Sequence, residues 1–159
     1  MLAHRNIEIM PTDPRTPEIV AMIHALDRYM EALYPAESNH LVDVNTLAQP
    51  NVHFFAARVD DRIVGCGAIM VHGLDYAEVK RVFVDPAARG LGLGRRLIDE
   101  LVATAQMQGI TFLRLETGIS QPEALGLFEA CGFTRCGPFG DYPADDPYSV
   151  FMERRVTMP

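Results

Sequence analysis

The stretch from Val79 to Arg96 constrains the fold of this chain more than any other part of the sequence. It begins as a β-rich apolar run, turns at Asp85-Pro86 and continues into a loop with glycines at positions 90, 92 and 94. Apolar residues then recur at helical spacing until Gly109, which predicts a helix that ends there. The order strand, turn, glycine loop and helix places the loop at a helix N-terminus.

This junction predicts an anion site between Arg89 and Arg95. Unpaired N–H groups and the positive end of the helix dipole converge there, and glycine lets a ligand approach the backbone closely. Phosphate is the usual guest of such a site. Five basic residues and one acid, Asp85, lie in the segment 80–96, whereas the whole chain has 14 basic and 21 acidic residues and a net charge of −7. Ion pairs within the helix would contribute only ~0.2–0.5 kcal/mol each, so they do not exclude a phosphate role.

Two familiar phosphate motifs do not fit the loop. A P-loop needs Lys-Ser or Lys-Thr after its last glycine, and Arg95-Arg96 stand there instead. The dinucleotide fingerprint G-x-G-x-x-G fails as well, because its third glycine would fall on Arg95 or Leu97. A plain flexible turn between strand and helix is the remaining alternative to a binding loop.

The pattern Arg89-Gly90-Leu91-Gly92-Leu93-Gly94 after a strand resembles the acetyl-CoA pyrophosphate loop of the GNAT N-acetyltransferase superfamily. The stretch from Leu127 to Phe133 resembles the Leu-Tyr-Glu-x-x-Gly-Phe signature that closes GNAT domains. The segment from Tyr142 to Glu153 is also similar to one bacterial branch of the superfamily. Together these resemblances cover roughly residues 7–156.

The remaining patterns predict an α/β chain that forms one domain over residues 1–159. We expect strands near 7–9, 52–59, 63–71, 76–84, 112–117, 133–136 and 149–156, and helices at 17–34, 43–47, 93–108 and 122–131. Thr16 is the expected N-cap of the first helix. A meander followed by βαβαβ units predicts a mixed α+β sheet. The resemblance implies the GNAT acyl-CoA N-acyltransferase fold, with a mostly antiparallel central sheet and helices on both faces.

Composition excludes several classes of protein. The acidic balance argues against a nucleic-acid partner and an anionic membrane partner. No apolar run approaches the ~18 residues of a membrane span, and the N-terminus lacks the apolar region of a signal peptide. Three cysteines form no even disulfide framework and no CxxC motif, so we expect a cytoplasmic protein whose cysteines belong to the core. We expect no metal site.

The resemblance implies acetyl-CoA as co-substrate and assigns a set of contacts to it. Main-chain groups of Val82 and Val84 would bind the pantetheine arm, whereas Phe83 alternates with them and would face the core on the other side of the sheet. Amides of the glycine loop would hold the pyrophosphate. The expected cofactor-binding residues are Val82, Phe83, Val84, Arg89, Gly90, Leu91, Gly92, Leu93, Gly94, Arg95, Gln121, Ala124 and Phe128.

Phe128 departs from the family pattern, because the family often has a tyrosine there that acts as general acid. A thiol of pKa ~8.5 leaves as an acceptable thiolate, whereas an amine of pKa ~10.4 must lose a proton before it attacks. We therefore expect base catalysis to matter more than acid catalysis. Glu78 is the main candidate base, acting through water, and its parity predicts a side chain on the same face as Val82 and Val84. A surface glutamate at a strand end is the alternative.

Other candidates for proton transfer are weaker. Tyr142 and Tyr148 could replace the missing hydroxyl, and Tyr142 is retained with Glu78 as a catalytic candidate; simple packing is its alternative. We expect Glu116 to pair with an arginine, Arg114 or Arg81. His40 and His53 are possible bases by residue type. Cys131 as an acyl-enzyme nucleophile lacks a histidine partner in the sequence.

These observations predict an enzyme that transfers an acetyl group from acetyl-CoA directly to a primary amine of a small molecule or peptide. Two variable loops, 34–50 and 137–147, are expected to bound the acceptor pocket. Asp141, Asp145 and Asp146 in the second loop would favour a cationic amine. The alternatives are a non-catalytic acyl-CoA-binding or sensor protein of the same fold, and a structural dimer module without a cofactor. A homodimer through pairing of the last strand is left open.

Overall fold

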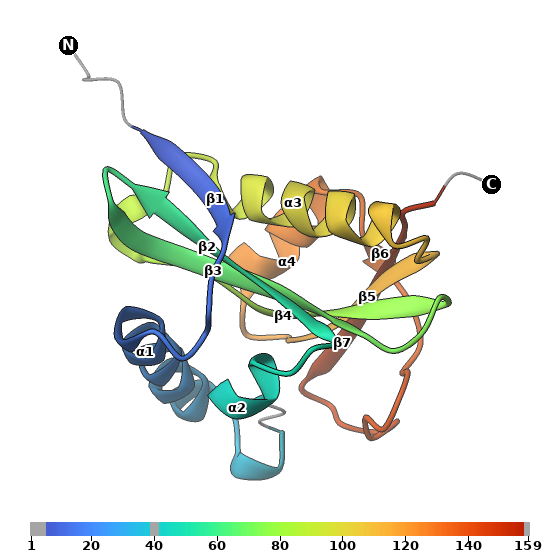
Figure 1. Cartoon of the computed structure of the whole chain (residues 1–159). Coiled ribbons are helices and arrows are strands. Elements are labelled where there is room, and N and C mark those ends of the chain that lie inside the picture. Colours follow the sequence, from blue (N-terminus) through green and yellow to red (C-terminus); the bar gives the residue numbers. More distant parts are fainter. Residues whose placement is uncertain (1–5, 39–41, 158–159) are drawn as a thin grey trace.

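The structure is a computed structural model that describes residues 6–38 and 42–157. A seven-stranded sheet runs through the molecule, with helices on both of its faces (Figure 1). The elements are β1 (Ile7–Pro11), α1 (Pro17–Leu33), η1 (Ala36–Ser38), α2 (Val44–Leu47), β2 (Val52–Val59), β3 (Arg62–Val71), β4 (Tyr76–Val84), η2 (Pro86–Ala88), α3 (Leu93–Met107), β5 (Phe112–Gly118), α4 (Pro122–Ala130), β6 (Thr134–Arg135) and β7 (Ser149–Arg155).

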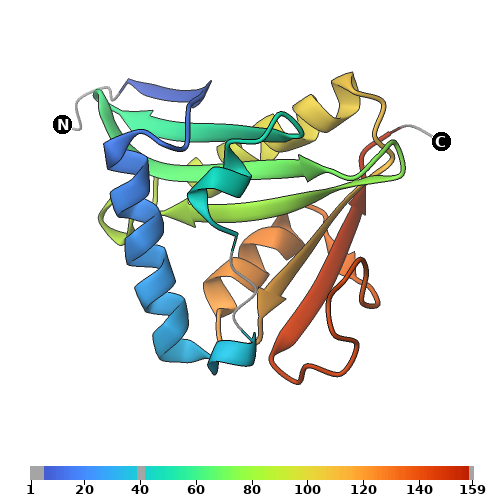
Figure 2. The same ribbon diagram turned by 60° about the horizontal axis from the view of Figure 1, so that its bottom comes forward.

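The strand order is β1-β2-β3-β4-β5-β7-β6, and of these pairs only β4 and β5 run parallel. Helices α1 and α2 cover one face, whereas α3 and α4 cover the other (Figures 1 and 2). The predicted mostly antiparallel sheet with helices on both faces is therefore confirmed.

The predicted elements are present in the predicted order, with small differences at their ends. The strand expected at 133–136 is only the two-residue strand β6. Thr16 is the N-cap residue of α1, as predicted, but its side chain makes no cap hydrogen bond, because its hydroxyl donates to the carbonyl oxygen of Asp13 at 2.6 Å. Asp43 does cap α2, since its carboxylate accepts the N–H of Thr46 at 2.8 Å.

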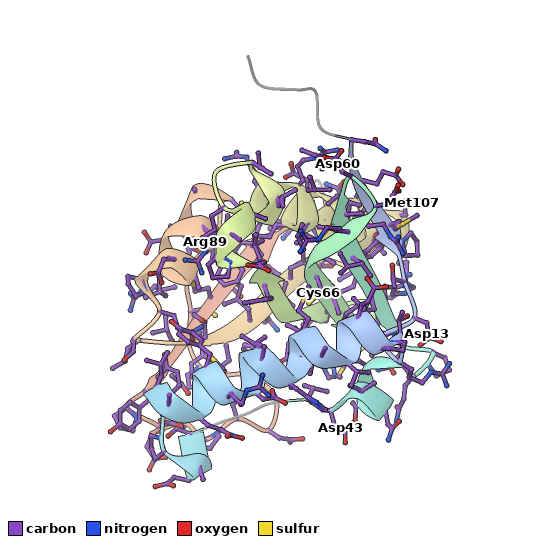
Figure 3. All side chains as sticks on the ribbon, turned by 90° about the vertical axis from the view of Figure 1, so that its left-hand side faces the viewer. Asp13, Asp43, Asp60, Cys66, Arg89 and Met107 are labelled. Carbon is purple, nitrogen blue, oxygen red and sulfur yellow. The ribbon has the colours of Figure 1, made fainter. Side chains whose placement is uncertain are left out.

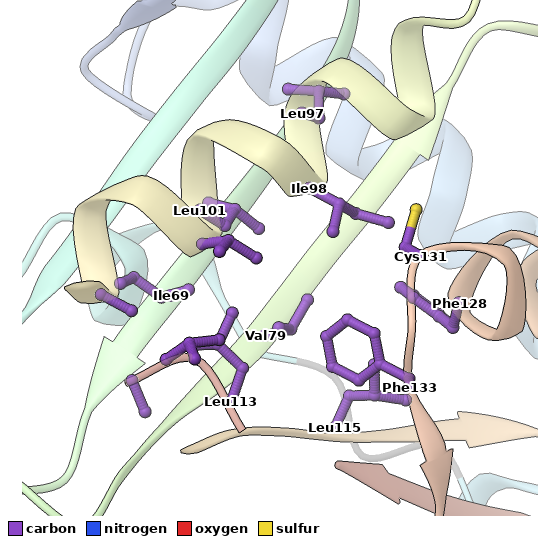
Figure 4. Packing of buried hydrophobic residues seen from close by; sticks show 14 of the residues in the cluster. Ile69, Val79, Leu97, Ile98, Leu101, Leu113, Leu115, Phe128, Cys131 and Phe133 are labelled. Atoms are coloured by element: carbon purple, nitrogen blue, oxygen red, sulfur yellow. The ribbon is translucent and has the colours of Figure 1, made fainter. Parts of the chain in front are cut away.

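The main core lies between the sheet and helices α3 and α4 (Figure 4). Leu97, Ile98 and Leu101 of α3 meet Val79 and Leu113 of the sheet, and all of these side chains are buried. A second cluster, under α1 and α2, includes the buried Ile19, Ile23, Leu47 and Cys66. Cys66 and Cys131 are both buried, as predicted for core cysteines.

Strand β4 contains a kink at Arg81, which has a φ of 56°. The pairing with β3 shifts there, since Cys66 lies opposite Phe83 whereas Ala68 lies opposite Lys80. The extra residue is a β-bulge, and it inverts the alternation of side chains along the strand.

Because of the bulge, the predicted orientation of Glu78 is wrong: its side chain does not lie on the same face of the sheet as Val82 and Val84. Val82 and Val84 face the core under α3, together with Val79 before the bulge. Glu78 alternates with Val79 and therefore lies on the opposite face. Phe83 packs in the cluster under α1, so its predicted orientation is confirmed.

The parallel strands β4 and β5 pair only at their beginnings, where residues 76–78 lie opposite residues 112–114. Beyond this point the two strands diverge (Figure 2). Backbone groups on the facing edges of two parted strands have no partner across the gap. The divergence therefore leaves an open edge in the middle of the sheet. In the described part of the chain, no helix has the length and apolar character needed to cross a membrane.

Candidate active site

A cleft opens where β4 and β5 part, and it has two connected parts. The inner cleft has about 820 Å³ of open space, solvent-filled mouth included, and the outer cleft about 640 Å³. We call the place where they meet the neck. It is lined by the residues common to both parts: Leu26, Val82, Gln121, Ala124 and Phe128. Helix α1 forms one wall and helix α4 the other.

The glycine loop lies at the N-terminus of α3. Gly92 is the N-cap residue with a φ of 72°, and the first helical hydrogen bond joins the amide of Arg96 to the carbonyl of Gly92. Among the residues that the structure describes, none accepts a main-chain hydrogen bond from the amides of residues 90–95. The amide of Arg89 is different, because it donates to the carbonyl of Pro86 at 3.3 Å. The run of available amides is thus 90–95, one residue shorter than predicted.

Side chains in this segment explain where its ligand surface lies. Leu93 is buried and Leu91 packs on the same small cluster, so they can contribute only main-chain groups. Arg89 lines the outer cleft and lies on the segment between β4 and α3 (Figure 3). A Cβ on Gly94 would come within 2.8 Å of Leu127 Cδ2, so glycine at 94 allows α3 to pack on α4. The loop therefore offers a row of amides and one flanking arginine to an anion.

A buried polar cluster closes the inner cleft. The Glu78 side chain is 7 % exposed, accepts a hydrogen bond from the Tyr142 hydroxyl and forms an ion pair with Lys80 Nζ at 2.7 Å. Lys80 Nζ also donates to the Tyr142 oxygen at 2.5 Å, and His72 Nε2 lies 3.3 Å from the other Glu78 oxygen. Lys80 and Tyr142 line the inner cleft, with Glu78 behind them. The two predicted catalytic residues are thus brought together, although their catalytic roles stay predictions.

Aromatic packing fixes Tyr142 at this place. Its ring contacts Phe139 and Phe151 at centroid distances of 5.3 and 5.6 Å, and Phe139 also packs on Tyr76. Burial, followed by the nearby charge of Glu78 and the hydrogen bond to it, raises the pKa of Tyr142 well above its usual value. The hydroxyl therefore stays protonated at neutral pH.

A second tyrosine closes the opposite corner of the inner cleft. The hydroxyl of Tyr34 lies 3.2 Å from Gln121 Oε1 and accepts the N–H of Ser120 at 3.1 Å. Its ring passes directly over Gly118, where a Cβ would lie 1.8 Å from the hydroxyl oxygen. Burial raises the pKa of Tyr34 as well. The ring of Tyr34 can thus lie at the end of β5 only because residue 118 is a glycine.

Other predicted residues have different surroundings. Glu116 lines the inner cleft and accepts a hydrogen bond from Ser149 Oγ at 2.7 Å, whereas Arg114 pairs with Glu153 and Arg81 with Asp27. His53 Nε2 lies 2.6 Å from Gln108 Nε2, and His53 is not among the residues that line either part of the cleft. His40 lies outside the described residues. Burial raises the pKa of the Cys131 thiol, which disfavours a thiolate nucleophile.

Both predicted loops reach the inner cleft, but the three aspartates of the second loop that were expected to attract a cationic amine do not line it. Ser38 and Tyr142 contribute from the first and second loop, and Ser38 Oγ donates to Asp146 Oδ1 at 3.1 Å. None of Asp141, Asp145 and Asp146 is among the lining residues. The charged residues of the lining are instead Lys80, Arg81 and Glu116. The local charge that suggested a cationic acceptor is therefore not in the cleft.

Three site residues escaped sequence reasoning. Lys80 counted only as local positive charge, and Arg81 as positive charge and a possible partner of Glu116. Tyr34 counted as the end of a helix and the first residue of a loop, without a role of its own. Alternation could have placed Lys80 beside Glu78, two residues away on the same face. The contacts of Arg81 and Tyr34 join segments that are far apart in sequence, 54 residues from Asp27 and 87 residues from Gln121 respectively, so no local pattern signals them.

Comparison with known proteins identifies this arrangement. The family model described as acetyltransferase (GNAT) family matches residues 19–133. The chain belongs to the GNAT acetyltransferase family. A protein of Azospirillum brasilense named IAA acetyltransferase is 46% identical over 150 residues, which are 94% of this chain and 97% of that protein.

Solved structures agree with the family assignment. An acyl-CoA N-acyltransferase of Klebsiella pneumoniae has 35% identity and a TM-score of 0.79, with 94% of this chain and 97% of that chain covered. The PaiA N-acetyltransferase of Thermoplasma acidophilum, solved with coenzyme A, shares the fold at 17% identity and a TM-score of 0.70, with 94% and 99% covered.

The GNAT protein described here is thus an acetyl-CoA-dependent acyltransferase, with acetyl-CoA as its co-substrate. The cleft fits such a molecule at both ends: the available amides of 90–95 and Arg89 suit a pyrophosphate, and the unpaired edge of β4 suits an extended arm. The individual contacts remain predictions. Phe128 is buried at the neck with its ring 5.7 Å from Phe133, so this position supplies apolar surface in place of a hydroxyl.

Proposed function

We propose that this enzyme transfers the acetyl group of acetyl-CoA to a primary amine of a small molecule or peptide. The observation that supports the proposal most is the buried Glu78 carboxylate, which holds the Tyr142 hydroxyl on the wall of the inner cleft. Direct transfer is favoured because Cys131 is buried with a raised pKa, and none of the described residues that line the cleft is a cysteine. The amine nitrogen forms a bond to the thioester carbonyl carbon as the C–S bond breaks.

The amine must lose a proton, and Tyr142 with Glu78 provides a path for it. Glu78 itself is covered, so the acceptor meets Tyr142 first. The Tyr142 oxygen takes the proton from the nitrogen while its own proton passes along the existing hydrogen bond to Glu78. The sulfur leaves as a thiolate and needs no acid, which fits the apolar Phe128 at the neck. This replaces the water-mediated path that the sequence suggested.

Lys80 supports this path through its charge. Its ammonium donates to the Tyr142 oxygen, so that oxygen is polarised before the acceptor binds. A second positive charge beside it is unfavourable, which promotes loss of the proton from a bound ammonium. The neutral amine is the form that attacks.

The lining of the inner cleft suggests an acceptor with an apolar or aromatic body. Leu26, Met30 and Leu115 supply apolar surface, and Tyr34 and Tyr148 supply aromatic rings. Apolar pockets with a few convergent polar groups bind small molecules of this kind. We therefore propose an uncharged or weakly charged body next to the amine rather than a polycation.

The test is turnover of a panel of amines, followed by thiol release with a chromogenic reagent. We expect Glu78→Gln to lower kcat/KM by about 100-fold and Tyr142→Phe by about 10-fold or more, in the range of general base catalysis. Glu153→Gln is the matched control, because it alters a carboxylate that pairs with Arg114 outside the cleft. Wild-type rates in both site variants would refute the proton path. Coenzyme A binding without turnover of any amine would instead favour a non-catalytic protein.

A further inference from the structure

Arg81 has a backbone conformation that needs an explanation. Among the described residues, three that are not glycine have a positive φ: Asp60, Asp61 and Arg81. The two aspartates lie in the β2–β3 hairpin turn, where a two-residue connection requires such values. Arg81 lies inside a strand, where no turn requires it. Residues held in this way persist only where their surroundings over-determine them, and they cluster at functional sites.

Strand β3 leaves the room that the kink needs. A Cβ on Gly65 would lie 2.8 Å from the carbonyl oxygen of Phe83, and one on Gly67 would lie 3.3 Å from Val82 Cγ2. Between these glycines, Cys66 Sγ donates to the carbonyl oxygen of Arg81 at 3.2 Å. The neighbouring strand therefore permits the bulge, but permission alone does not hold a left-handed residue in place.

The side chain of Arg81 supplies the holding contacts. The side chain is 4% exposed, and its Nη1 lies 2.5 Å from Asp27 Oδ1 on α1. Nε and Nη2 both donate to the carbonyl oxygen of Val42, at 3.2 and 2.7 Å. We call these contacts the Arg81 clamp. One side chain thus ties the kinked strand to α1 and to the segment before α2.

The clamp acts on both walls of the inner cleft. Residues 79–82 line it from β4, and Leu26, Met30 and Tyr34 line it from α1 or its end. Asp27 immediately follows Leu26, a residue of the neck. A change in the clamp would therefore shift the kink and the opposite wall together.

We propose that Arg81 is a positioning residue, and that its clamp on Asp27 and Val42 holds the kink of β4 in the orientation that aims main-chain N–H groups at the thioester carbonyl. The inference rests on the proposed function. The amides of the glycine loop begin nine residues after Arg81, and none of them bonds to the clamp among the described residues. The amides expected to bind the pyrophosphate are therefore not part of the clamp, so a change in the clamp should affect carbonyl activation more than the uptake of coenzyme A.

The test compares Arg81→Ala, Arg81→Gly and Asp27→Ala with Asp27→Asn and wild type. Alanine and glycine both remove the guanidinium, but only glycine adopts a positive φ without strain. The first readout is infrared difference spectroscopy of bound acetyl-CoA with a ¹³C label at the thioester carbonyl, which needs no acceptor. A donor aimed at the carbonyl lowers its stretching frequency. The second readout is kcat with the best amine, and the third is the Kd of coenzyme A.

In wild type we expect the labelled band to lie at lower frequency than in free acetyl-CoA. In Arg81→Ala and Asp27→Ala at least half of this displacement disappears and kcat falls about 10-fold, while the Kd of coenzyme A changes less than threefold. Arg81→Gly regains part of both losses. Asp27→Asn keeps the shape of the side chain, so we expect a smaller loss of both the band displacement and kcat. This variant takes the place of the alanine variants if those do not fold. Glu153→Ala, which removes a partner of Arg114 outside the cleft, leaves the band unchanged.

A purely structural arginine gives a different result: lower melting temperatures with a wild-type band and a wild-type kcat. That result overturns the inference, as does an undisplaced band in wild type or a glycine variant no better than the alanine variant. If the band responds as expected but no amine is acetylated, the proposed acceptor class fails and the positioning role stands. If amines are acetylated but the band ignores the clamp, the positioning role alone fails.

Discussion

Replacing Gly118 with alanine adds one methyl group at the end of β5 and should displace a whole tyrosine ring. The new Cβ would lie 1.8 Å from the Tyr34 hydroxyl oxygen, 2.1 Å from Cζ and 2.8 Å from Cε1. All three distances are shorter than any relaxed contact, and two of them involve the ring itself. Tyr34 therefore has to leave its site between Gly118 and Gln121.

The cost follows from what the ring loses. Overpacking in a core costs roughly 1–3 kcal/mol. The Tyr34 hydroxyl also gives up its contacts with Gln121 Oε1 and the N–H of Ser120, each worth about 0.5–1.5 kcal/mol. Alanine regains roughly 0.4–1 kcal/mol by restricting the unfolded chain. We expect Gly118→Ala to lower the free energy of unfolding by about 3 kcal/mol, or the melting temperature by roughly 6–12 °C.

The assay is urea and thermal unfolding in a double-mutant cycle with Tyr34→Ala. Once the ring is absent, the Gly118→Ala change should cost less than about 0.5 kcal/mol, because the three atoms nearest to the new methyl group all belong to Tyr34. Gly126→Ala is the matched control. Nothing lies within 4 Å of its Cβ and it sits in α4, so alanine there should stabilise by up to about 1 kcal/mol.

Two results would refute the reasoning. One is a Gly118→Ala variant within 1 kcal/mol of wild type, and the other is a cost that stays the same after Tyr34 is truncated. A folded Gly118→Ala variant should also raise the KM of the acceptor amine, because Tyr34 lines the inner cleft and its ring would be pushed into it.

Three further predictions concern the loop, the thiols and the tyrosines. Gly92→Ala forces a φ of 72° on alanine, so the Kd of coenzyme A by calorimetry should rise at least tenfold with a stability loss of roughly 1–3 kcal/mol; an unchanged Kd would exclude the loop from binding. Burial raises the pKa of Cys66 to about 12, so at pH 8 its thiolate fraction is about 10³-fold below that of a thiol at the reference value of 9.0. Alkylation of the folded protein, followed by mass spectrometry, should therefore leave Cys66 unmodified, whereas Cys66 of the unfolded protein should react. Rapid labelling of Cys66 in the folded protein would contradict this. Burial raises the pKa of Tyr142, so the contribution of Tyr142 to stability is constant below about pH 10 and falls above it, where the unfolded chain ionises Tyr142 and the folded chain does not. In a tyrosinate absorbance titration to about pH 11, Tyr142→Phe should reduce the amplitude of the unfolded protein only.

Local signals in the sequence were sufficient for the loop that defines the outer cleft. The order from Val79 to Arg96 predicted a strand, a turn and a helix N-terminus, and the structure has all three. The prediction succeeded because each part depends on neighbouring residues: Pro86 ends the strand, and glycine at 92 takes the left-handed N-cap. Glycine at 94 has a reason that no local pattern contains, since its partner Leu127 lies on another helix.

The prediction that Glu78 lies on the same face as Val82 and Val84 was wrong for a physical reason. Alternation along a strand assumes regular pairing, and one extra residue at Arg81 moves every later side chain to the other face. The bulge depends on glycines of β3 and on a carboxylate of α1, so the strand that contains it has no signal for it. Glycines inside a strand, such as Gly65 and Gly67 of β3, indicate close packing or a bulge nearby, but they do not tell which strand bends.

We propose that residues outside α4 carry the proton chemistry of this enzyme. Position 128 holds a phenylalanine that packs on Phe133, so α4 offers the neck an apolar surface. The tyrosine hydroxyls of the inner cleft come from elsewhere: Tyr34 from the end of α1, and Tyr142 and Tyr148 from the segment before β7. Of these, Tyr142 donates to the buried carboxylate of Glu78, which lies on β4. Since a thiolate leaves without help and an amine does not attack until it is neutral, a hydroxyl is more useful beside the amine than beside the sulfur. On this proposal, the apolar side chain at 128 and the cluster around Glu78 both follow from one requirement, the removal of a proton from the acceptor.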